Sequence, residues 1–543
     1  MEVTLAIRRL IPLTLALVCA SWLAFAQNKP IPQLVKKGEK YTFMVDGKPF
    51  IIMGGQVGNN SAFPDRMERV WPIMKAMSAN MIQFPVYWDE IEPQQGRFEF
   101  GAFDQILTSA RAAGLRVVPL WFGTWKNGMM DYVPAWIKAD PVRFAHVLNS
   151  HRERVKVLSP NSKTNMEADR QAFSALMKHI REIDEADRTV IMVQVENEPG
   201  IFGSVRDFSA ETTKLFNGPV PDSLVTALKK KPGTWKEVFG KRADEFFNAH
   251  SMATYINEVA KAGKEAYPLP MYMNVWNGGD GFGENESQME YPGEAYPSGG
   301  ATTTVHDLYK AVAKSIDIIA IDCYWQSPRK FRDATQKFKR PDNPLFVAET
   351  GRGIAMGAFF WVIGEFDAIG FSPYGIDGGG GRGAADWVSA VGVDYRVCGP
   401  AMNIIADLQG TGKLQVAVEE QGIQGKNLFF DQYDMAVRFG GAPRPGGAPA
   451  APVSQPAAPG PTGPGRVMVA QLAPDEFLFM GASVSVDIHP AYGSGYTAAQ
   501  YLRAEEGTYQ GGVWKAAAVR NGDIRALSLP ANGSMMKVKL TRY

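Results

Sequence analysis

The sequence is poor in the residue types that form disulfide frameworks and metal sites. Its 543 residues include only 3 cysteines and 6 histidines, and neither type clusters at the spacing of zinc ligands. One cysteine, Cys19, lies in an N-terminal apolar segment, which leaves Cys323 and Cys398 for the rest of the chain. We therefore expect a protein that is stabilised by its apolar core rather than by disulfides, with no structural metal.

An excess of charge of either sign is also missing. The 57 Lys and Arg residues nearly cancel the 56 Asp and Glu residues, for a formal net charge of +1. No long-range field therefore favours nucleic acid or an acidic membrane as a partner. The glycines at 378–381 are not followed by the Lys-Ser/Thr pair of a phosphate-binding loop.

Long apolar runs are absent except at the N-terminus. Arg8 and Arg9 precede an apolar run over residues 10–25, and residues 24–26 (Ala-Phe-Ala) supply the small side chains that a signal peptidase requires. A membrane anchor is the alternative, but the run is short for a spanning helix and polar residues follow at once. The sequence predicts a signal peptide at 1–26, export to the periplasm or the cell exterior, and no integral membrane segment after cleavage.

Between about residues 40 and 400, short apolar runs alternate with amphipathic stretches. Continuous apolar runs are typical of parallel strands covered on both faces, and the stretches between them carry apolar residues at helical spacing. The expected strands are 50–57, 81–86, 116–123, 190–198, 270–276, 316–324, 345–350 and 368–372. The alternation predicts an α/β fold, a (β/α)₈ TIM barrel within residues 27–411. A doubly wound open sheet is the alternative, but it lacks the Gly-rich loop after its first strand.

The pattern changes after residue 411. Short apolar runs separated by turn residues predict an all-β, sandwich-like domain over 412–543. Residues 441–466 are mostly Gly, Ala and Pro, which cannot bury a core, so we expect a disordered loop there. This loop is predicted to interrupt one β domain, because neither flank holds enough strands to fold alone.

Two glutamates end the fourth and seventh predicted strands, in residues 193–199 (VQVENEP) and 345–351 (LFVAETG). The carboxyl ends of barrel strands face the active site, and strands four and seven lie across the barrel mouth. Glu198 and Glu349 are therefore expected to face one substrate. Glycoside hydrolysis uses such a pair of carboxyl groups: one protonates the leaving oxygen, and the other attacks or activates water. Period-two alternation predicts that Glu196 lies on the same side of the strand as Glu198.

A third motif follows the second strand, in residues 87–93 (YWDEIEP) and 96–100 (GRFEF). Together the three motifs resemble the retaining β-glycosidases with (β/α)₈ barrels. Within that clan they are most similar to glycoside hydrolase family 35, the β-galactosidases, which has a similar Trp, acidic Glu-Pro, Gly, Phe run after strand two and a similar Glu-Asn-Glu after strand four. The C-terminal β domain is similar to the uncharacterised domain that follows the barrel in a bacterial branch of that family.

The resemblance implies a role for each matching residue and requires no cofactor or metal. Glu198 would be the acid/base and Glu349 the nucleophile. The implied sugar contacts are Asn197 at the hydroxyl beside the reacting carbon, Glu196 as a support of the sugar or the site, and Tyr87 on galactose. Tyr324, at the end of the sixth strand, is expected to lie beside the nucleophile or to pack in the core.

The segment after strand three departs from the family. Members typically carry an acidic residue there that holds galactose hydroxyls, whereas residues 121–128 read WFGTWKNG. We expect Trp125, Lys126 and Asn127 to make these contacts instead, which weakens the expectation of strict galactose specificity.

The sequence thus predicts an exported retaining β-glycosidase, a β-galactosidase that removes terminal galactosyl residues from oligo- or polysaccharides. Two alternatives stay open: an endo-acting β-glycanase of the same clan, and a non-catalytic carbohydrate-binding protein. The expected partner is a carbohydrate, and the sequence does not define the oligomeric state.

Overall fold

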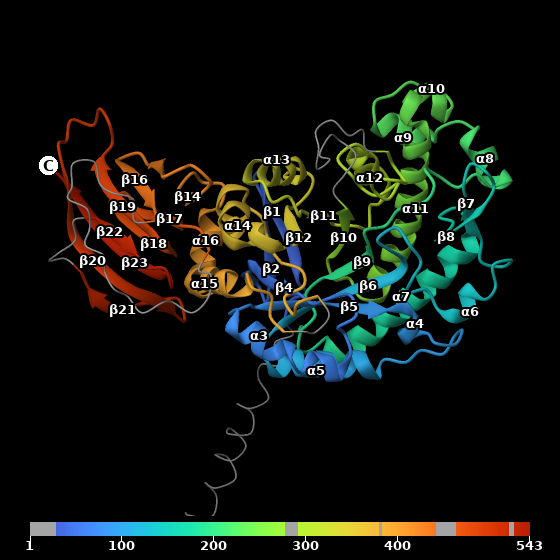
Figure 1. Ribbon diagram of the computed structural model, residues 1–543, viewed down its shortest axis with the longest axis horizontal. Coiled ribbons are helices and arrows are strands. Elements are labelled where there is room, and N and C mark those ends of the chain that lie inside the picture. Colours follow the sequence, from blue (N-terminus) through green and yellow to red (C-terminus); the bar gives the residue numbers. More distant parts are fainter. Residues whose placement is uncertain (1–28, 277–290, 380–382, 441–462, 521–525) are drawn as a thin grey trace, which may run out of the picture.

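The computed structural model describes residues 29–276, 291–379, 383–440, 463–520 and 526–543. A helix-covered barrel lies at one end of the molecule and an antiparallel β region at the other (Figure 1). The predicted signal peptide at 1–26 and most of the predicted loop 441–466 lie outside the described residues. In the described part of the chain, every helix is too short or too polar to cross a membrane.

Eight parallel strands close a barrel in the order β10-β11-β12-β13-β4-β5-β6-β9. In chain order they are β4 (Ile52–Gln56), β5 (Met81–Tyr87), β6 (Arg116–Lys126), β9 (Val193–Asn197), β10 (Met271–Trp276), β11 (Ile318–Asp322), β12 (Phe346–Glu349) and β13 (Gly370–Phe371). Each one overlaps an apolar run that was predicted as a strand, so the TIM-barrel prediction is confirmed.

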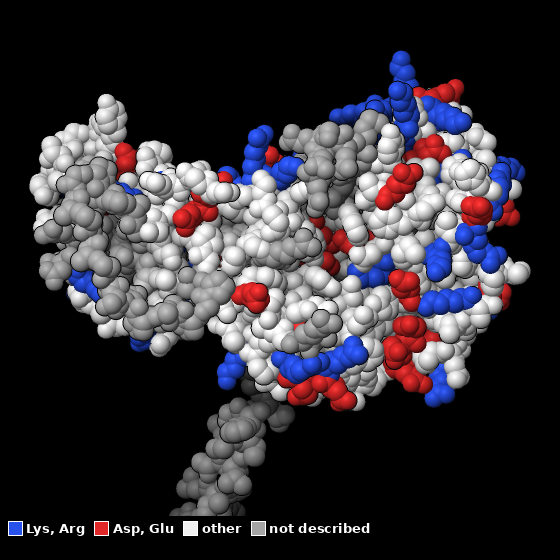
Figure 2. Space-filling view, in the orientation of Figure 1, with Lys and Arg blue, Asp and Glu red and all other residues white. Residues whose placement is uncertain are grey.

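Helices surround the barrel and bury the outer faces of the strands, which is why the strands are apolar on both faces. The helices are α2 (Pro64–Met67), α3 (Val70–Ala76), α4 (Trp88–Ile91), α5 (Gly101–Ala112), α6 (Ala135–Lys138), α7 (Lys163–Asp184), α8 (Ala210–Phe216), α9 (Asp222–Ala227), α10 (Trp235–Phe239), α11 (Ala243–Ala266), α12 (His306–Val312), α13 (Pro328–Phe338), α14 (Ala355–Phe360), α15 (Val388–Cys398) and α16 (Met402–Leu408). A π-helical turn, η3 (Trp361–Glu365), continues α14. Charges of both signs are mixed over the face seen in Figure 2, in keeping with the near-zero net charge.

Two small sheets accompany the barrel. A three-stranded antiparallel sheet of β1 (Gln33–Lys37), β2 (Lys40–Val45) and β3 (Lys48–Pro49) precedes it. A hairpin of β7 (His146–Leu148) and β8 (Arg154–Leu158) lies between β6 and α7. Neither sheet was predicted from the sequence.

The C-terminal region consists of two antiparallel sheets, which confirms the all-β prediction. One has the order β14-β17-β18-β23-β20-β21 and the other β15-β16-β19-β22. Their strands are β14 (Leu414–Val418), β15 (Gly425–Phe429), β16 (Tyr433–Phe439), β17 (Arg466–Ala473), β18 (Glu476–Ala482), β19 (Val484–Pro490), β20 (Ala499–Gln510), β21 (Val513–Val519), β22 (Leu527–Leu529) and β23 (Ser534–Arg542). Strands from both sides of 441–462 pair with each other, β14 with β17 and β16 with β19.

The β region packs on the barrel helices through a core that contains one buried ion pair. Arg466 at the start of β17 donates from Nε to Asp394 Oδ1 of α15 at 2.5 Å, and the two side chains are 0% and 1% exposed. The same guanidinium donates to the Ala390 carbonyl at 3.1 Å. Around it, β14 packs so closely on η3 that a Cβ added to Gly364 would lie 2.3 Å from Val416 Cγ1.

Removing one member of this pair is expected to destabilise the protein strongly. In Asp394→Ala the Arg466 guanidinium stays buried without its counter-charge, and the free energy of unfolding should fall by about 3–5 kcal/mol. Denaturant unfolding measures this loss. The matched control is Asp333→Ala, which removes an exposed pair with Arg329 at 3.8 Å and should change stability by less than about 1 kcal/mol. Equal losses in the two variants would contradict the prediction.

Candidate active site

Three buried carboxylates meet at the carboxyl ends of barrel strands. Glu198 follows β9, Asp322 ends β11 and Glu349 ends β12, and their exposed fractions are 6%, 2% and 5%. One carboxylate oxygen of each residue lies within 4.8 Å of those of the other two. The structure therefore brings together the two glutamates that the sequence singled out and adds a third acid that it did not.

Glu349 is held in place by donors from four neighbouring segments. Its Oε1 accepts from Gln56 Nε2 at 2.8 Å and, at 3.3 Å each, from the side-chain amides of Asn197 and Asn274. Its Oε2 accepts from the Tyr324 hydroxyl at 2.9 Å. Both oxygens are thus fixed, which orients the carboxylate toward the barrel mouth.

Asn274 of β10 links all three acids. Its Oδ1 accepts from the Glu198 backbone N–H at 2.9 Å, so its Nδ2 must face the carboxylates. Nδ2 donates to Asp322 Oδ2 at 2.6 Å and to Glu349 Oε1 at 3.3 Å. One amide therefore sets the spacing of the group.

Glu198 has the electrostatic surroundings of an acid that keeps its proton near neutrality. Burial raises its pKa to about 7, the negative charge of Glu349 adds to the rise, and the Lys126 ammonium opposes it. Burial and the charges of Glu349 and Glu198 also raise the pKa of Asp322 well above its ordinary value. Buried acids whose pKa values are shifted by desolvation and by a specific neighbouring charge are characteristic of active sites.

Glu196 does not belong to this group of carboxylates. Its two carboxylate oxygens accept from the backbone N–H groups of Thr124, at 3.3 Å, and Trp125, at 2.7 Å. Burial and the neighbouring Asp169 of α7 raise its pKa well above the ordinary value. Glu196 does not lie on the same side as Glu198, as period-two alternation predicted, because the backbone turns at this point, with φ of 62° at Glu196 and 43° at Glu198. Glu196 secures the end of β6 and does not join the other two glutamates.

The three residues expected to replace the missing acid after strand three lie in different surroundings. Trp125 is fully buried and packs edge-to-face on Tyr255 of α11 at 4.6 Å, so it lies in the core behind β6. Asn127 has a φ of 53°, and its backbone N–H donates to the Asn197 carbonyl at 3.1 Å. Only Lys126 interacts with the acids, as the positive charge that opposes the pKa rise of Glu198.

Of the two tyrosines predicted from the sequence, only Tyr324 contacts the carboxylate group. The Tyr87 hydroxyl donates to the Asn59 carbonyl at 2.8 Å and accepts from the Ala62 N–H at 3.2 Å, while its ring stacks on Phe63 and Tyr132. It therefore holds the loop after β4, whereas Tyr324 touches Glu349. The sugar-binding roles of both tyrosines stay predictions.

Sequence reasoning missed Gln56, Asn274 and Asp322. Each is a polar residue at or near the carboxyl end of an apolar barrel strand, β4, β10 and β11 respectively. The rule that located Glu198 and Glu349 applies to these residues as well, and a search of all eight strand ends would have found them.

The carboxylate group is better suited to proton chemistry than to holding a cation. Glu198, Asp322 and Glu349 are the one set of acidic, His or Cys side chains in the described chain with ligand atoms close enough to share an ion. Amide and hydroxyl donors already occupy both oxygens of Glu349, and Lys126 supplies a positive charge. We therefore assign these oxygens to hydrogen bonding and proton transfer.

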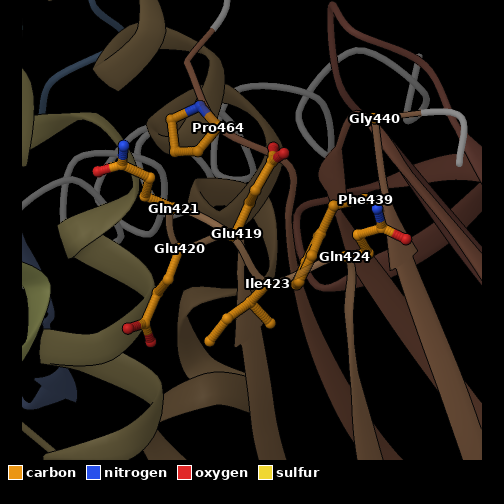
Figure 3. A pocket seen from close by; sticks show the side chains of 9 residues that line it. Glu419, Glu420, Gln421, Ile423, Gln424, Phe439, Gly440 and Pro464 are labelled. Carbon is orange, nitrogen blue, oxygen red and sulfur yellow. The ribbon is translucent and has the colours of Figure 1, made fainter.

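A separate hollow lies in the β region, where β14, β15 and β16 meet near Pro464 (Figure 3). Its two acids are already engaged: Glu419 accepts from the Gly465 N–H at 2.7 Å, and Glu420 lies 3.5 Å from Arg332. None of its lining residues comes from a barrel strand, so we do not assign it to the reaction.

Comparison with known proteins agrees with the motifs. Residues 42–293 match the sequence profile of glycosyl hydrolases family 35, and residues 391–528 match a domain of unknown function, DUF5597. A β-galactosidase of Xanthomonas manihotis is 26% identical over 264 residues, 43% of this chain and 40% of that protein. β-Galactosidase 8 of Oryza sativa subsp. japonica is 29% identical over 177 residues, 31% of this chain and 24% of that protein. The resemblance to family 35 is thus confirmed over residues 42–293, and the chain matches less than half the length of either relative.

Among solved structures, a β-galactosidase from Rahnella sp. R3 aligns with 60% of this chain and 50% of its own. The sequence identity is 16% and the TM-score 0.39, a value too low to carry an argument.

Proposed function

Taking the barrel as a domain similar to glycosyl hydrolases family 35, we propose that this chain is a retaining β-glycosidase, a β-galactosidase that removes terminal galactosyl residues from oligo- or polysaccharides. One observation carries the proposal: carboxylate oxygens of Glu198 and Glu349 lie within 4.8 Å of each other. Retaining enzymes have carboxyl groups about 5–5.5 Å apart, whereas inverting enzymes keep about 6.5–9.5 Å for a water molecule. The close spacing favours direct attack by one glutamate.

The reaction proceeds in two displacements. The Glu349 carboxylate attacks the anomeric carbon, the glycosidic bond breaks, and Glu198 gives its proton to the departing oxygen. The ester that forms removes the negative charge of Glu349, so the pKa of Glu198 falls and Glu198 becomes the base for the second step. Water then attacks the anomeric carbon, its proton passes to Glu198, and Glu349 is released.

The location of the mature protein is also part of the proposal. The charged start, apolar run and small residues of 1–26 support export to the periplasm or the cell exterior. Fractionation of cells that produce the full chain tests this, and activity retained in the cytoplasm would contradict it.

A panel of nitrophenyl glycosides on the purified protein tests the activity. We expect the β-galactoside to be the fastest substrate and the first product to carry the β configuration, which proton NMR detects before mutarotation. No turnover on any glycoside would favour a binding protein, and an α product would indicate single displacement.

The acidity of Glu198 predicts how the rate depends on pH. Since Glu198 must be protonated to act as the acid and its pKa is raised to about 7, kcat/KM should fall as the pH rises through about 7. In Lys126→Met the loss of the ammonium should raise the pKa of Glu198 and move this basic limb to higher pH. Lys178→Met, which changes an exposed lysine on α7, is the control. A limb that stays in place in Lys126→Met would contradict the assignment.

A further inference from the structure

We propose that Asp322 shares a proton with Glu198, so that the acid of this site is a carboxyl pair. Asp322 is then a positioning residue that acts through Glu198. The inference rests on the proposed function, because it assigns a further residue to the same reaction.

Glu198 lies beside the second oxygen of Asp322, which has no donor among the described residues. Its side chain is 2% exposed, and Oδ2 accepts a 2.6 Å bond from Asn274 Nδ2. Oδ1 is buried and receives no hydrogen bond from the described chain. A carboxylate oxygen of Glu198 lies within 4.8 Å, and a hydrogen bond between the two side chains raises the pKa of Asp322 and lowers that of Glu198. Two ionised carboxylates only accept hydrogen bonds, so a proton between them supplies the missing donor.

The charges around the pair favour retention of this proton. Glu349 adds a third carboxylate, and Lys126 supplies the opposing ammonium. Tyr272 from β10, Tyr324 after β11 and Tyr374 after β13 also face the group, and burial raises the pKa of each phenol, so all three are neutral at pH 7. Two adjacent acids in such a place titrate as a unit and hold their last proton to higher pH than one acid alone.

A second acid pair, Glu196 and Asp169, also shares a hydrogen bond but does not belong to the carboxylate group around Glu349. Asp169 lies beside Glu196, but both of its oxygens accept hydrogen bonds, from Trp121 Nε1 at 2.9 Å and from Thr124 Oγ1 at 2.7 Å. Asp169 is therefore fixed by donors that do not titrate. Of the two pairs, that of Glu198 and Asp322 has carboxylate oxygens within 4.8 Å of the nucleophile.

The first displacement leaves the charge of the site unchanged. Before attack, ionised Glu349 and the singly protonated pair carry two negative charges. When the pair gives its proton to the departing oxygen, the pair holds both charges and Glu349 has become a neutral ester. In the second step water attacks the anomeric carbon, its proton returns to the pair, and the ester bond breaks to regenerate the Glu349 carboxylate.

The test is the pH profile of Asp322→Asn on a nitrophenyl β-galactoside. The amide keeps the shape and removes the neighbouring charge, so the basic limb of kcat/KM should move down by at least one pH unit. On a dinitrophenyl glycoside, which needs no acid, the first step should stay within about threefold of the wild-type rate. Asp169→Asn, the same change beside the other strand-four glutamate, should leave the limb in place.

Several outcomes would overturn the inference. An unchanged limb in Asp322→Asn refutes proton sharing, and a raised KM with an unchanged limb makes Asp322 a sugar contact.

If the asparagine variant does not fold, Asp322→Glu keeps a carboxyl group and should keep the high-pH limb. A limb lowered as though the carboxyl were absent would refute the pair. Infrared pH titration of carboxyl groups provides a readout without turnover: the carboxyl band that differs between the wild type and Asp322→Asn should titrate at a higher pH in the wild type, whereas the band of Glu196 should be common to both. A wild-type protein inactive on every glycoside refutes the proposed function, whereas the infrared result decides the pair separately.

Discussion

Glu349→Gln should remove turnover by on the order of 10⁵–10⁶-fold, the scale on which loss of a catalytic nucleophile acts. The loss should be the same for good and poor leaving groups, because an amide cannot form the glycosyl ester in either case. The amide oxygen can still accept from Gln56 or Tyr324, so the fold should be preserved. Rates with nitrophenyl and dinitrophenyl glycosides measure the effect, and circular dichroism checks the fold.

The matched control is Glu182→Gln on the exposed side of α7, which should keep the wild-type rate. Turnover in Glu349→Gln within tenfold of the wild type would remove Glu349 as the nucleophile.

Glu198→Gln should depend on the leaving group. A dinitrophenol departs without a proton, so the first displacement should persist and the glycosyl ester should accumulate, because no base activates water for the second step. A poor leaving group should lose about 10²–10⁴-fold, the usual contribution of general acid catalysis. Azide needs no base to attack, so its addition should speed the variant and yield a β-glycosyl azide.

The product of that rescue is decisive for the order of steps. An α-glycosyl azide would indicate single displacement and would remove the double-displacement mechanism. Equal loss on good and poor leaving groups would remove Glu198 as the acid, and Asp322, the adjacent carboxylate, would become the next candidate.

The sequence predicted the barrel well because its strands are buried on both faces. The runs 190–198 and 316–324 are mostly apolar up to the strand end, and this pattern can be recognised without knowing which strands lie beside them. The sheet of β1, β2 and β3 was missed because its short strands, some with exposed lysines, carry no such pattern.

Only those site residues could be predicted whose placement follows from the rule that the carboxyl ends of barrel strands face the active site. It located Glu198 and Glu349, but the positive φ of Glu196 breaks the alternation on which its placement depended. Trp125 was misjudged for a related reason: the pairing of β6 with β9 shifts register between Trp121 and Lys126, so side-chain directions cannot be counted along this stretch. The contact of Gln56 with Glu349 joins residues 293 positions apart and exists only in the closed barrel.

The buried pair between α15 and β17 bears on how the protein is made. Asp394 and Arg466 are 72 residues apart, and a ribosome adds about 5–20 residues per second. Once Asp394 has emerged, roughly 4–14 s pass before its counter-charge emerges as well. During that interval the barrel strands are complete, yet the helical face around Gly364 lacks the β14 and β17 side chains that cover it. The nascent barrel therefore exposes an aggregation-prone apolar surface that includes an unpaired acid. A chain cut at residue 411 would keep that surface permanently, and we expect it to aggregate or to be held by chaperones rather than to accumulate as a free barrel.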